Sequence, residues 1–261
     1  IGFATFEIAN PYVNTNCDII LTASSWGRDI LKNAGYKSDV IFGRLPLPIY
    51  EYDKMPEQFI HIGKYELRKQ TQYLVDTFII ASTRTDKELI LNIVCFNPFS
   101  ENTTLEQSLL RYGFTRIAHV YRRANLTINL FNKFISDNHL LELKKKSIHI
   151  YPGGSEGANL SLLESLNYHF NDIFIEPIYC PTTAHSDLNQ YLKHSTNLKV
   201  ESMKAYDGIF FKDHNTKNEF YRIELESLIN QILTAPQTNT YTQISQIDTI
   251  DNIFYKWINS I

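Results

Sequence analysis

The chain has 261 residues, of which 43% are hydrophobic and 13% aromatic, a composition that predicts a folded globular protein and excludes a disordered one. Its net charge of -3 excludes the strong basic excess of most dedicated nucleic-acid-binding proteins, so we expect no nucleic-acid partner. Three cysteines, Cys17, Cys95 and Cys180, lie far apart without metal-ligand or disulfide spacing, which favours a reducing, cytoplasmic setting. We find no transmembrane run and no signal peptide in the sequence.

Strand and helix signals alternate from the first fifty residues onward. Residues 17–23 (CDIILTA) form a short apolar run between polar residues, which predicts a buried strand. A helix over residues 26–34 follows, ended by Gly35, and residues 40–42 predict another strand. Residues 43–57 contain three prolines, which fix φ and remove backbone donors, so we interpret this stretch as a linker between domains.

After this linker the alternation resumes and continues through most of the chain. The predicted strands cover residues 58–62, 89–96, 116–120, 147–151, 173–175 and 208–211. The predicted helices cover residues 71–82, 105–112, 130–146, 160–168 and 220–233. This order predicts an α/β fold with a Rossmann-like parallel sheet flanked by helices. Apolar residues near the chain end, after residue 247, have the spacing of an amphipathic helix that docks on another surface.

The most informative segment is YPGGSEGANLSLLE, residues 151–164, where a strand leads through a glycine-rich turn into a helix. Glycines allow a sharp turn and a close approach of the backbone to a ligand, and a helix N-terminus favours a phosphate. Glu156 lies in the turn and Glu164 lies eight positions later, within the helix. The alternative interpretation is structural, because Ser161 and Glu164 have the spacing of a capping box and Glu156 suits a solvated turn.

A second candidate site is GKYELRK, residues 63–69, directly after the first strand that follows the linker. Lys64, Arg68 and Lys69 gather three cations beside the carboxyl end of that strand, which suits a diphosphate. The alternative is an exposed basic start of a helix, although cations at that end oppose the helix dipole. His61 and His149 alternate with apolar residues in their strands, so we expect both to be structural.

These residues together resemble the retaining glycosyltransferases of the GT-B fold, in particular those similar to glycosyltransferase family 4. The segment IHIYPGGSEGANLSLLESL matches the family's pattern of two glutamates separated by seven residues after a strand. Gly63, Lys64 and Lys69 keep the spacing of the family's glycine and phosphate-binding cations, and DIILTASSWGRDILKNAGY with the later PLPI is similar to the end of its N-terminal domain.

The resemblance implies a division of the chain and a set of site residues. Residues 1–50 would be a partial N-terminal domain and hinge, residues 51–240 a nucleotide-sugar-binding domain, and residues 241–261 a helix that packs back on the first part. Lys64, Lys69 and Glu156 would be catalytic, with the lysines neutralising the departing diphosphate and Glu156 holding the transferred sugar. Glu164 would hold the donor ribose, and the remaining donor-binding positions would be Gly63, Arg68, Gly154, Gly157, Ala158, Asn159 and Leu160.

The activity implied is transfer of a sugar from a nucleotide-sugar donor to an acceptor with retention of configuration. We expect neither a metal nor a cofactor, because the positive charge would come from side chains and a helix N-terminus. The acceptor, whether glycan, lipid or protein, is left open, and the rest of the N-terminal domain would come from a longer chain or a partner. Three alternatives stay open: a nucleotide-sugar-binding module without turnover, an epimerase or hydrolase of the same architecture, and a degenerate relative that binds no nucleotide.

Overall fold

The structure is a computed structural model. It describes residues 2–4, 18–22, 25–33, 35–37, 39–42, 58–65, 69–95, 103–153, 173–174, 200–204 and 219–234. The predicted linker, the predicted helix over residues 160–168, the predicted strand over residues 208–211 and the predicted C-terminal helix lie outside these ranges. The proposed domain boundaries therefore stay predictions.

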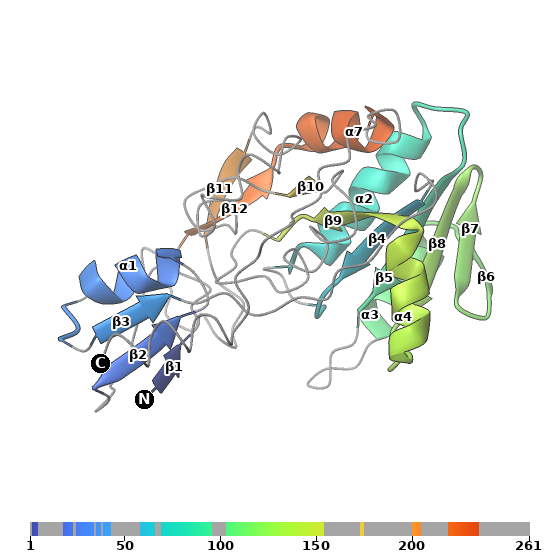
Figure 1. Cartoon of the computed structure of the whole chain (residues 1–261). Helices are drawn as coiled ribbons and strands as arrows, with labels where there is room; N and C mark the ends of the chain where they lie inside the picture. Colours follow the sequence, from blue (N-terminus) through green and yellow to red (C-terminus); the bar gives the residue numbers. More distant parts are fainter. Residues whose placement is uncertain are drawn as a thin grey trace.

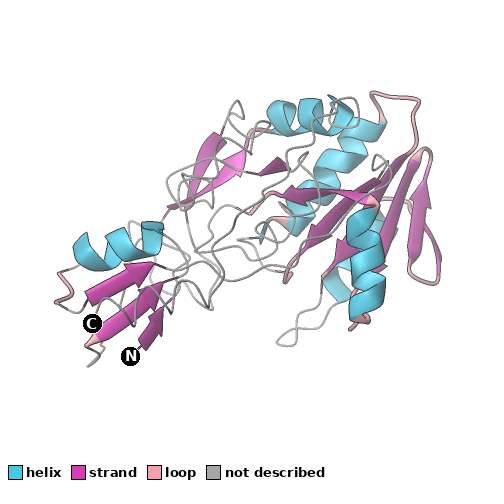
Figure 2. Cartoon of the chain, in the orientation of Figure 1, coloured by secondary structure: helices cyan, strands magenta, loops and turns pink. Residues whose placement is uncertain are grey.

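The largest unit is a sheet with the strand order β10-β9-β4-β5-β8-β7-β6 (Figures 1 and 2). Its strands are β4 (Gln58–Ile62), β5 (Leu89–Val94), β6 (Thr115–Ile117), β7 (Val120–Arg123), β8 (Leu126–Phe131), β9 (Ser147–Tyr151) and β10 (Ile173–Phe174). The five strands from β10 to β8 are parallel to one another, and β7 and β6 add an antiparallel hairpin at one edge. The Rossmann-like parallel sheet that the sequence predicts is thereby confirmed, with the hairpin as an addition.

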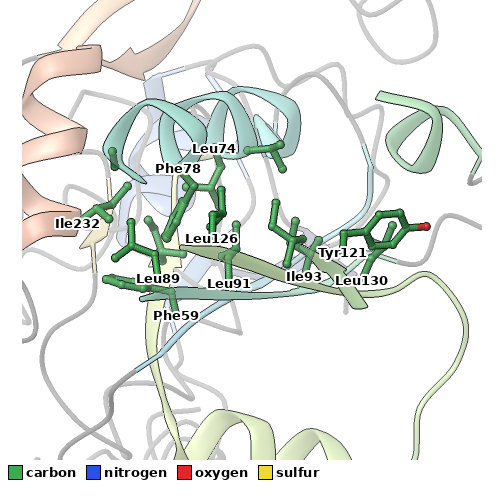
Figure 3. Close-up of a cluster of buried hydrophobic side chains, with 14 of the residues drawn as sticks. Phe59, Leu74, Phe78, Leu89, Leu91, Ile93, Tyr121, Leu126, Leu130 and Ile232 are labelled. Atoms are coloured by element: carbon green, nitrogen blue, oxygen red, sulfur yellow. The ribbon is translucent and has the colours of Figure 1, made fainter. Parts of the chain in front are cut away.

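Helices cover both faces of this sheet. Between consecutive strands lie α2 (Thr71–Ser82), α3 (Thr103–Arg111) and α4 (Asp137–Lys145), and α7 (Leu225–Thr234) comes later in the chain. Buried side chains of α2, α3 and α7 belong to one apolar cluster with alternate residues of the strands. Among the strand residues are Phe59, Leu91 and Leu126 (Figure 3). The opposite face meets α4, whose carbonyl groups at Leu143 and Lys144 bond side chains of β9.

Two smaller sheets complete the described part of the chain. One is parallel, with β1 (Gly2–Ala4), β2 (Ile19–Thr22) and β3 (Asp39–Phe42) in that order and α1 (Ser25–Asn33) between its last two strands. The other pairs β11 (Val200–Lys204) with β12 (Glu219–Ile223) in antiparallel orientation. The sequence predicts β2, α1 and β3 but neither β1 nor the β11–β12 pair.

Glycine ends two helices as expected. Gly35 and Gly113 both have φ of 81°, a left-handed conformation that costs glycine little. After α3, the N–H of Gly113 donates to the Leu110 carbonyl and that of Phe114 to the Leu109 carbonyl, which satisfies carbonyls at the helix end. The boundaries that the sequence predicts for α1 and α3 are therefore correct to within two residues.

One predicted strand is wrong, and two predicted helices are present but begin later than expected. The strand predicted over residues 116–120 spans a turn, because Ala118 has φ of 55° and separates β6 from β7. The helix predicted over residues 130–146 begins only after Ser136, whose hydroxyl accepts from the His139 N–H, and residues 130–131 belong to β8. The helix predicted over residues 220–233 begins at Leu225, because the preceding residues pair with β11.

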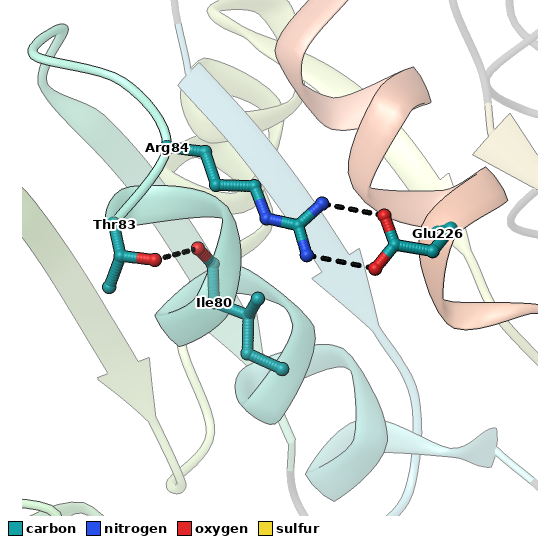
Figure 4. Close-up of polar contacts among 4 residues, drawn as sticks. All are labelled: Ile80, Thr83, Arg84 and Glu226. Atoms are coloured by element: carbon teal, nitrogen blue, oxygen red, sulfur yellow. Dashed lines mark hydrogen bonds and ion pairs between the residues drawn. The ribbon is translucent and has the colours of Figure 1, made fainter.

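A bidentate ion pair joins the end of α2 to the start of α7 (Figure 4). Arg84 Nη1 and Nη2 lie 2.6 and 2.8 Å from the carboxylate oxygens of Glu226, and Thr83 Oγ1 donates to the Ile80 carbonyl beside them. The hydrogen bond from Arg84 lowers the pKa of Glu226 below its ordinary value. Both side chains are well exposed, so solvent screens the interaction and its contribution to stability should be small.

Replacing Glu226 by glutamine should slightly lower the free energy of unfolding near neutral pH, and the loss should shrink in acid. A group whose folded pKa is depressed contributes stability above its ordinary pKa and loses it as the pH falls through the folded value. Urea denaturation at neutral pH and below about pH 3, each at low and high salt, measures the difference. Glu224→Gln, which removes a neighbouring exposed charge, is the control; a Glu226 deficit independent of pH and salt would contradict the prediction.

Candidate functional site

The strand order of the large sheet reverses between β4 and β9. The chain passes from β4 to β5 and on to β8 in one direction, then returns to place β9 on the other side of β4. We call the carboxyl ends of β4 and β9 the switch point. In open α/β sheets, ligands bind outside the carboxyl ends of the strands at the position where the order reverses. The topology therefore selects one edge and one pair of strands as the candidate site.

Both segments that the sequence predicts as sites begin at this switch point. Gly63 and Lys64 directly follow β4, and Pro152 and Gly153 directly follow β9. The two strands are parallel and adjacent, with Phe59 opposite Ile148, so their carboxyl ends lie side by side. The structure thus brings together the starts of two segments that are almost ninety residues apart in the sequence.

The described part of the candidate site contains Gly63, Lys64 and Lys69. The other predicted site residues lie outside the described ranges: Arg68, Gly154, Glu156, Gly157, Ala158, Asn159, Leu160 and Glu164. Their roles stay predictions. Pro152 and Gly153 are buried, so the chain leaves β9 from within the protein.

Gly63 and Lys69 lie close together at the end of β4. The Gly63 N–H donates to the Val94 carbonyl at 3.0 Å, which continues the pairing of β4 with β5. A methyl group on Gly63 would lie 3.5 Å from His61 Nε2 and 3.6 Å from Lys69 Cδ, both ordinary contact distances. The φ of Gly63 is not in the positive range that favours glycine. Neither the backbone conformation nor the described packing requires glycine at this position.

The single residue between Lys69 and α2, Gln70, has an unusual backbone conformation. Gln70 has φ of 55° and ψ of 30°, a left-handed conformation that is costly for a residue with a side chain. The Gln70 side chain makes no capping hydrogen bond to the helix, although its carbonyl accepts from the Leu74 N–H at 3.0 Å. Lys69 therefore lies directly before a helix start that is held in a strained conformation, and no signal in the sequence predicts this strain.

His61 connects three elements beneath the switch point. Its side chain is 2% exposed, with Nδ1 3.2 Å from the Ile150 carbonyl of β9 and Nε2 3.0 Å from Thr71 Oγ1 at the start of α2. A carbonyl can only accept, so Nδ1 carries the proton, and in the neutral ring Nε2 accepts from the Thr71 hydroxyl. The prediction that His61 is structural is confirmed. Its partner Thr71 is a residue that the sequence analysis does not single out.

His149 and Cys95 are both buried, and the structural role predicted for His149 is supported. His149 Nε2 lies 3.0 Å from the Lys144 carbonyl and Nδ1 lies 3.2 Å from the Tyr151 hydroxyl, so its ring joins β9 to α4. Cys95, the residue after β5, is 2% exposed, and burial raises the pKa of its thiol to about 12. Because the thiolate is the reactive form, Cys95 is unsuited to act as a nucleophile at neutral pH.

Neither a metal site nor a membrane-spanning helix is found among the described residues. Within those ranges, no group of three or more His, Cys, Asp or Glu side chains is arranged to hold a metal ion. In the same part of the chain, we find no helix with the length and hydrophobicity needed to cross a membrane. The two glutamates of the predicted site lie outside these ranges, so the expectation of metal-independent chemistry stays a prediction.

Comparison with solved structures gives the class of fold. The chain is similar to a TarM variant from S. aureus in complex with fondaparinux, alpha-GlcNAc-glycerol and UDP, with a TM-score of 0.57, 11% sequence identity, and coverage of 99% of this chain and 50% of TarM. It is also similar to the GtfA/B complex, with a TM-score of 0.54, 14% identity, and coverage of 93% of this chain and 44% of that one. OtsA follows with a TM-score of 0.52, 9% identity, and coverage of 93% and 60%.

These neighbours are glycosyltransferases of the GT-B fold, and this chain has the same fold. At identities of 9% to 14% the likeness concerns the fold alone. The chain spans about half the length of these solved structures. No protein-family model and no curated protein sequence matches the chain. The GT-B fold anticipated from the resemblance is thus confirmed, whereas membership of family 4 is not.

Proposed function

We propose that this chain is the nucleotide-sugar-binding part of a glycosyltransferase that transfers a sugar to an acceptor with retention of configuration. The observation that supports this most strongly is the switch point, where a cation-containing segment follows β4 and the glycine-rich segment of the sequence begins beside it after β9. That pairing suits a nucleoside diphosphate, because Lys64 and Lys69 supply positive charge and the predicted glycine-rich turn would supply backbone N–H groups.

The chemistry that these residues would perform is stabilisation of a leaving group. Negative charge builds on the nucleoside diphosphate as its bond to the sugar breaks. Fixed cations from Lys64 and Lys69 would stabilise that charge in the transition state without needing to reorganise. Glu156 would hold the transferred sugar and Glu164 the ribose hydroxyls. Gly63 would leave room for the diphosphate, since a methyl group there would occupy space between the His61 ring and the Lys69 stem.

A rival proposal is a module of the same fold that binds a nucleotide sugar without transferring it. The chain spans 44% to 60% of its structural neighbours, so binding is the property to test before transfer. If a nucleotide sugar binds, incubating it with the chain and analysing the products distinguishes a binding module, a hydrolase and an epimerase. A binding module leaves the donor intact, a hydrolase releases free sugar, and an epimerase changes its configuration. If transfer occurs, the anomeric configuration of the product tests the proposal of retention.

The first experiment is thermal unfolding with UDP, GDP, ADP and their sugar conjugates. UDP leads the panel because the TarM structure contains it. A ligand at about 100 times its dissociation constant stabilises the folded state by roughly 2.7 kcal/mol. One nucleotide family should produce this shift, and Lys69→Ala and Glu164→Ala should each reduce it while leaving weaker, measurable binding.

The matched control for this experiment is Lys87→Ala. Lys87 is exposed in the loop before β5, at the opposite edge of the sheet from the switch point. Its loss removes the same charge as Lys69→Ala and should leave the nucleotide shift intact. If no nucleotide stabilises a well-folded chain, or if Lys69→Ala and Lys87→Ala behave alike, the proposed donor site is wrong.

A further inference from the structure

We propose that His61 is a positioning residue that holds Lys69 at the switch point through the start of α2. This inference rests on the proposed function, because it assigns Lys69 to the phosphates of the donor. His61 lies on β4, and its two ring nitrogens reach β9 on one side and α2 on the other. Its ring therefore joins β9 to α2 at the carboxyl edge of β4.

The contacts of the ring define the path to Lys69. Thr71 Oγ1 lies 3.0 Å from His61 Nε2, and Thr71 is the first residue of α2, two positions after Lys69. The ring and the Lys69 stem also enclose the same small space. A methyl group on Gly63 would lie 3.5 Å from Nε2 and 3.6 Å from Lys69 Cδ. His61 is thus linked to Lys69 by a hydrogen bond two residues away and by proximity around Gly63.

The strained backbone between Lys69 and Thr71 explains why such a tie is needed. Gln70 has φ of 55°, and a left-handed residue with a side chain persists only where its surroundings fix it on both sides. The His61–Thr71 hydrogen bond fixes the helix side of Gln70. Because Thr71 is 1% exposed, water does not replace this bond easily when it is lost. Relaxation of Gln70 would then change the direction in which the chain presents Lys69.

The test uses a pair of substitutions at Thr71 that differ mainly in the hydroxyl. Thr71→Val keeps the shape and removes the donor to His61, whereas Thr71→Ser keeps the hydroxyl. His61→Asn, which is too short to reach Thr71, is the second way to break the bond. Affinity for UDP, GDP and ADP is measured by calorimetry and stability by urea denaturation. Thr71→Val should bind the preferred nucleotide about tenfold more weakly, the effect of one lost hydrogen bond, and Thr71→Ser should retain affinity.

A double-mutant cycle that combines Thr71→Val with Lys69→Ala distinguishes a role in positioning Lys69 from a general loss of stability. If His61 and Thr71 act through Lys69, Thr71→Val should cause no further loss of affinity in a Lys69→Ala background. Equal affinity of Thr71→Val and Thr71→Ser, or losses that add to that of Lys69→Ala, would overturn the inference. A destabilised Thr71→Val with unchanged affinity would also overturn it, because that result assigns the bond to folding alone.

The experiment also separates failure of this inference from failure of the proposed function. If the unsubstituted chain binds no nucleotide diphosphate, the proposed function falls. Hydrogen exchange at the Leu74 amide, which donates to the Gln70 carbonyl, then reports whether His61 orders the start of α2. Faster exchange in Thr71→Val and His61→Asn than in Thr71→Ser supports the ordering role, and equal exchange in all three overturns it.

Discussion

Replacing Phe78 by alanine should lower the free energy of unfolding by about 3 to 5 kcal/mol, the usual cost of deleting a buried phenylalanine side chain. Phe78 is fully buried at 0% exposure in the middle of α2. Its ring meets that of Phe59 edge to face, with centroids 5.1 Å apart and planes at 76°, which joins α2 to β4 (Figure 3). The substitution loses this ring pair and leaves a cavity that the closely packed neighbours fill only in part.

The size of this effect follows from where Phe78 lies in the apolar cluster. Leu74, Leu91 and Ile232 belong to the same cluster and come from α2, β5 and α7, so the cavity would lie between a sheet and two helices. Because small domains are stable by only about 5 to 15 kcal/mol, such a loss is a large part of the total. It should appear as a lower urea midpoint at an unchanged slope, since the surface exposed on unfolding is nearly the same.

Phe134→Ala is the matched control for Phe78→Ala. Phe134 is 84% exposed after β8, so its removal should change the free energy of unfolding by no more than about 0.5 kcal/mol. Equal losses in the two variants would show that α2 does not pack on β4 as described. Such a result would also remove the basis for placing Lys69, because α2 fixes the position of the segment before it.

Helices and strands with a clear change of composition at their ends could be predicted from the sequence alone. Strands β4 and β9 and helix α2 have the predicted boundaries, because each is a long enough apolar pattern with a clear change of composition at its ends. Gly35 and Gly113 have the left-handed φ that their position after a helix predicts. The parallel arrangement followed from the same alternation, since helices between strands return the chain to the same edge.

The hairpin β6–β7 and strand β8 could not be predicted, because their turns lack the usual residues. Ala118 and Ala124 occupy left-handed positions, with φ of 55° and 49°, where turn rules look for glycine or asparagine. A signal for the start of α4 was nevertheless present, since Ser136 before Asp137 is a good helix cap. The boundary between β12 and α7 depends on pairing with β11, a contact between residues about twenty positions apart that no local pattern reports.

The sequence predicts where in the fold the candidate site lies, but it does not predict how the residues of the site are arranged. A glycine-rich turn and a basic segment after strands indicate the carboxyl edge of a parallel sheet. The sequence does not reveal that β4 and β9 are neighbours, because strand order depends on long-range packing. The hydrogen bond between Thr71 and His61 could not be predicted for the same reason. A lone histidine in an apolar strand indicates a core residue, but it does not indicate which residue bonds to its ring.

The second large effect concerns Asn92, whose replacement by alanine should destabilise the fold by about 3 to 4 kcal/mol through loss of a buried polar network. Asn92 is 0% exposed in the centre of β5, on the face of the sheet opposite the apolar cluster. Its Nδ2 lies 3.1 Å from Gln58 Oε1, 3.1 Å from the Phe59 carbonyl and 3.4 Å from Ser147 Oγ. Its Oδ1 accepts from Asn129 Nδ2 at 2.8 Å.

This network spans the strands that form the switch point. Gln58 and Phe59 belong to β4, Ser147 to β9 and Asn129 to β8, so one side chain links four parallel strands. Alanine would leave several buried partners without their hydrogen bonds, and each such group costs the free energy of its lost hydration. Because β4 and β9 end at the candidate site, loosening this network should also weaken nucleotide affinity in the proposed site.

Two further substitutions separate the hydrogen bonds of Asn92 from its volume. Asn92→Asp has nearly the same size but turns a donor into an acceptor facing three acceptor oxygens, so at neutral pH it should destabilise at least as much as alanine. Asn138→Ala removes an exposed asparagine from α4 and should be close to neutral. The urea midpoints of Asn92→Ala, Asn92→Asp and Asn138→Ala show whether the hydrogen bonds of Asn92 or its volume stabilise the fold. If Asn92→Asp is well tolerated, the buried amide is not donating to β4 and β9, and the polar face of the sheet does not hold the switch point together.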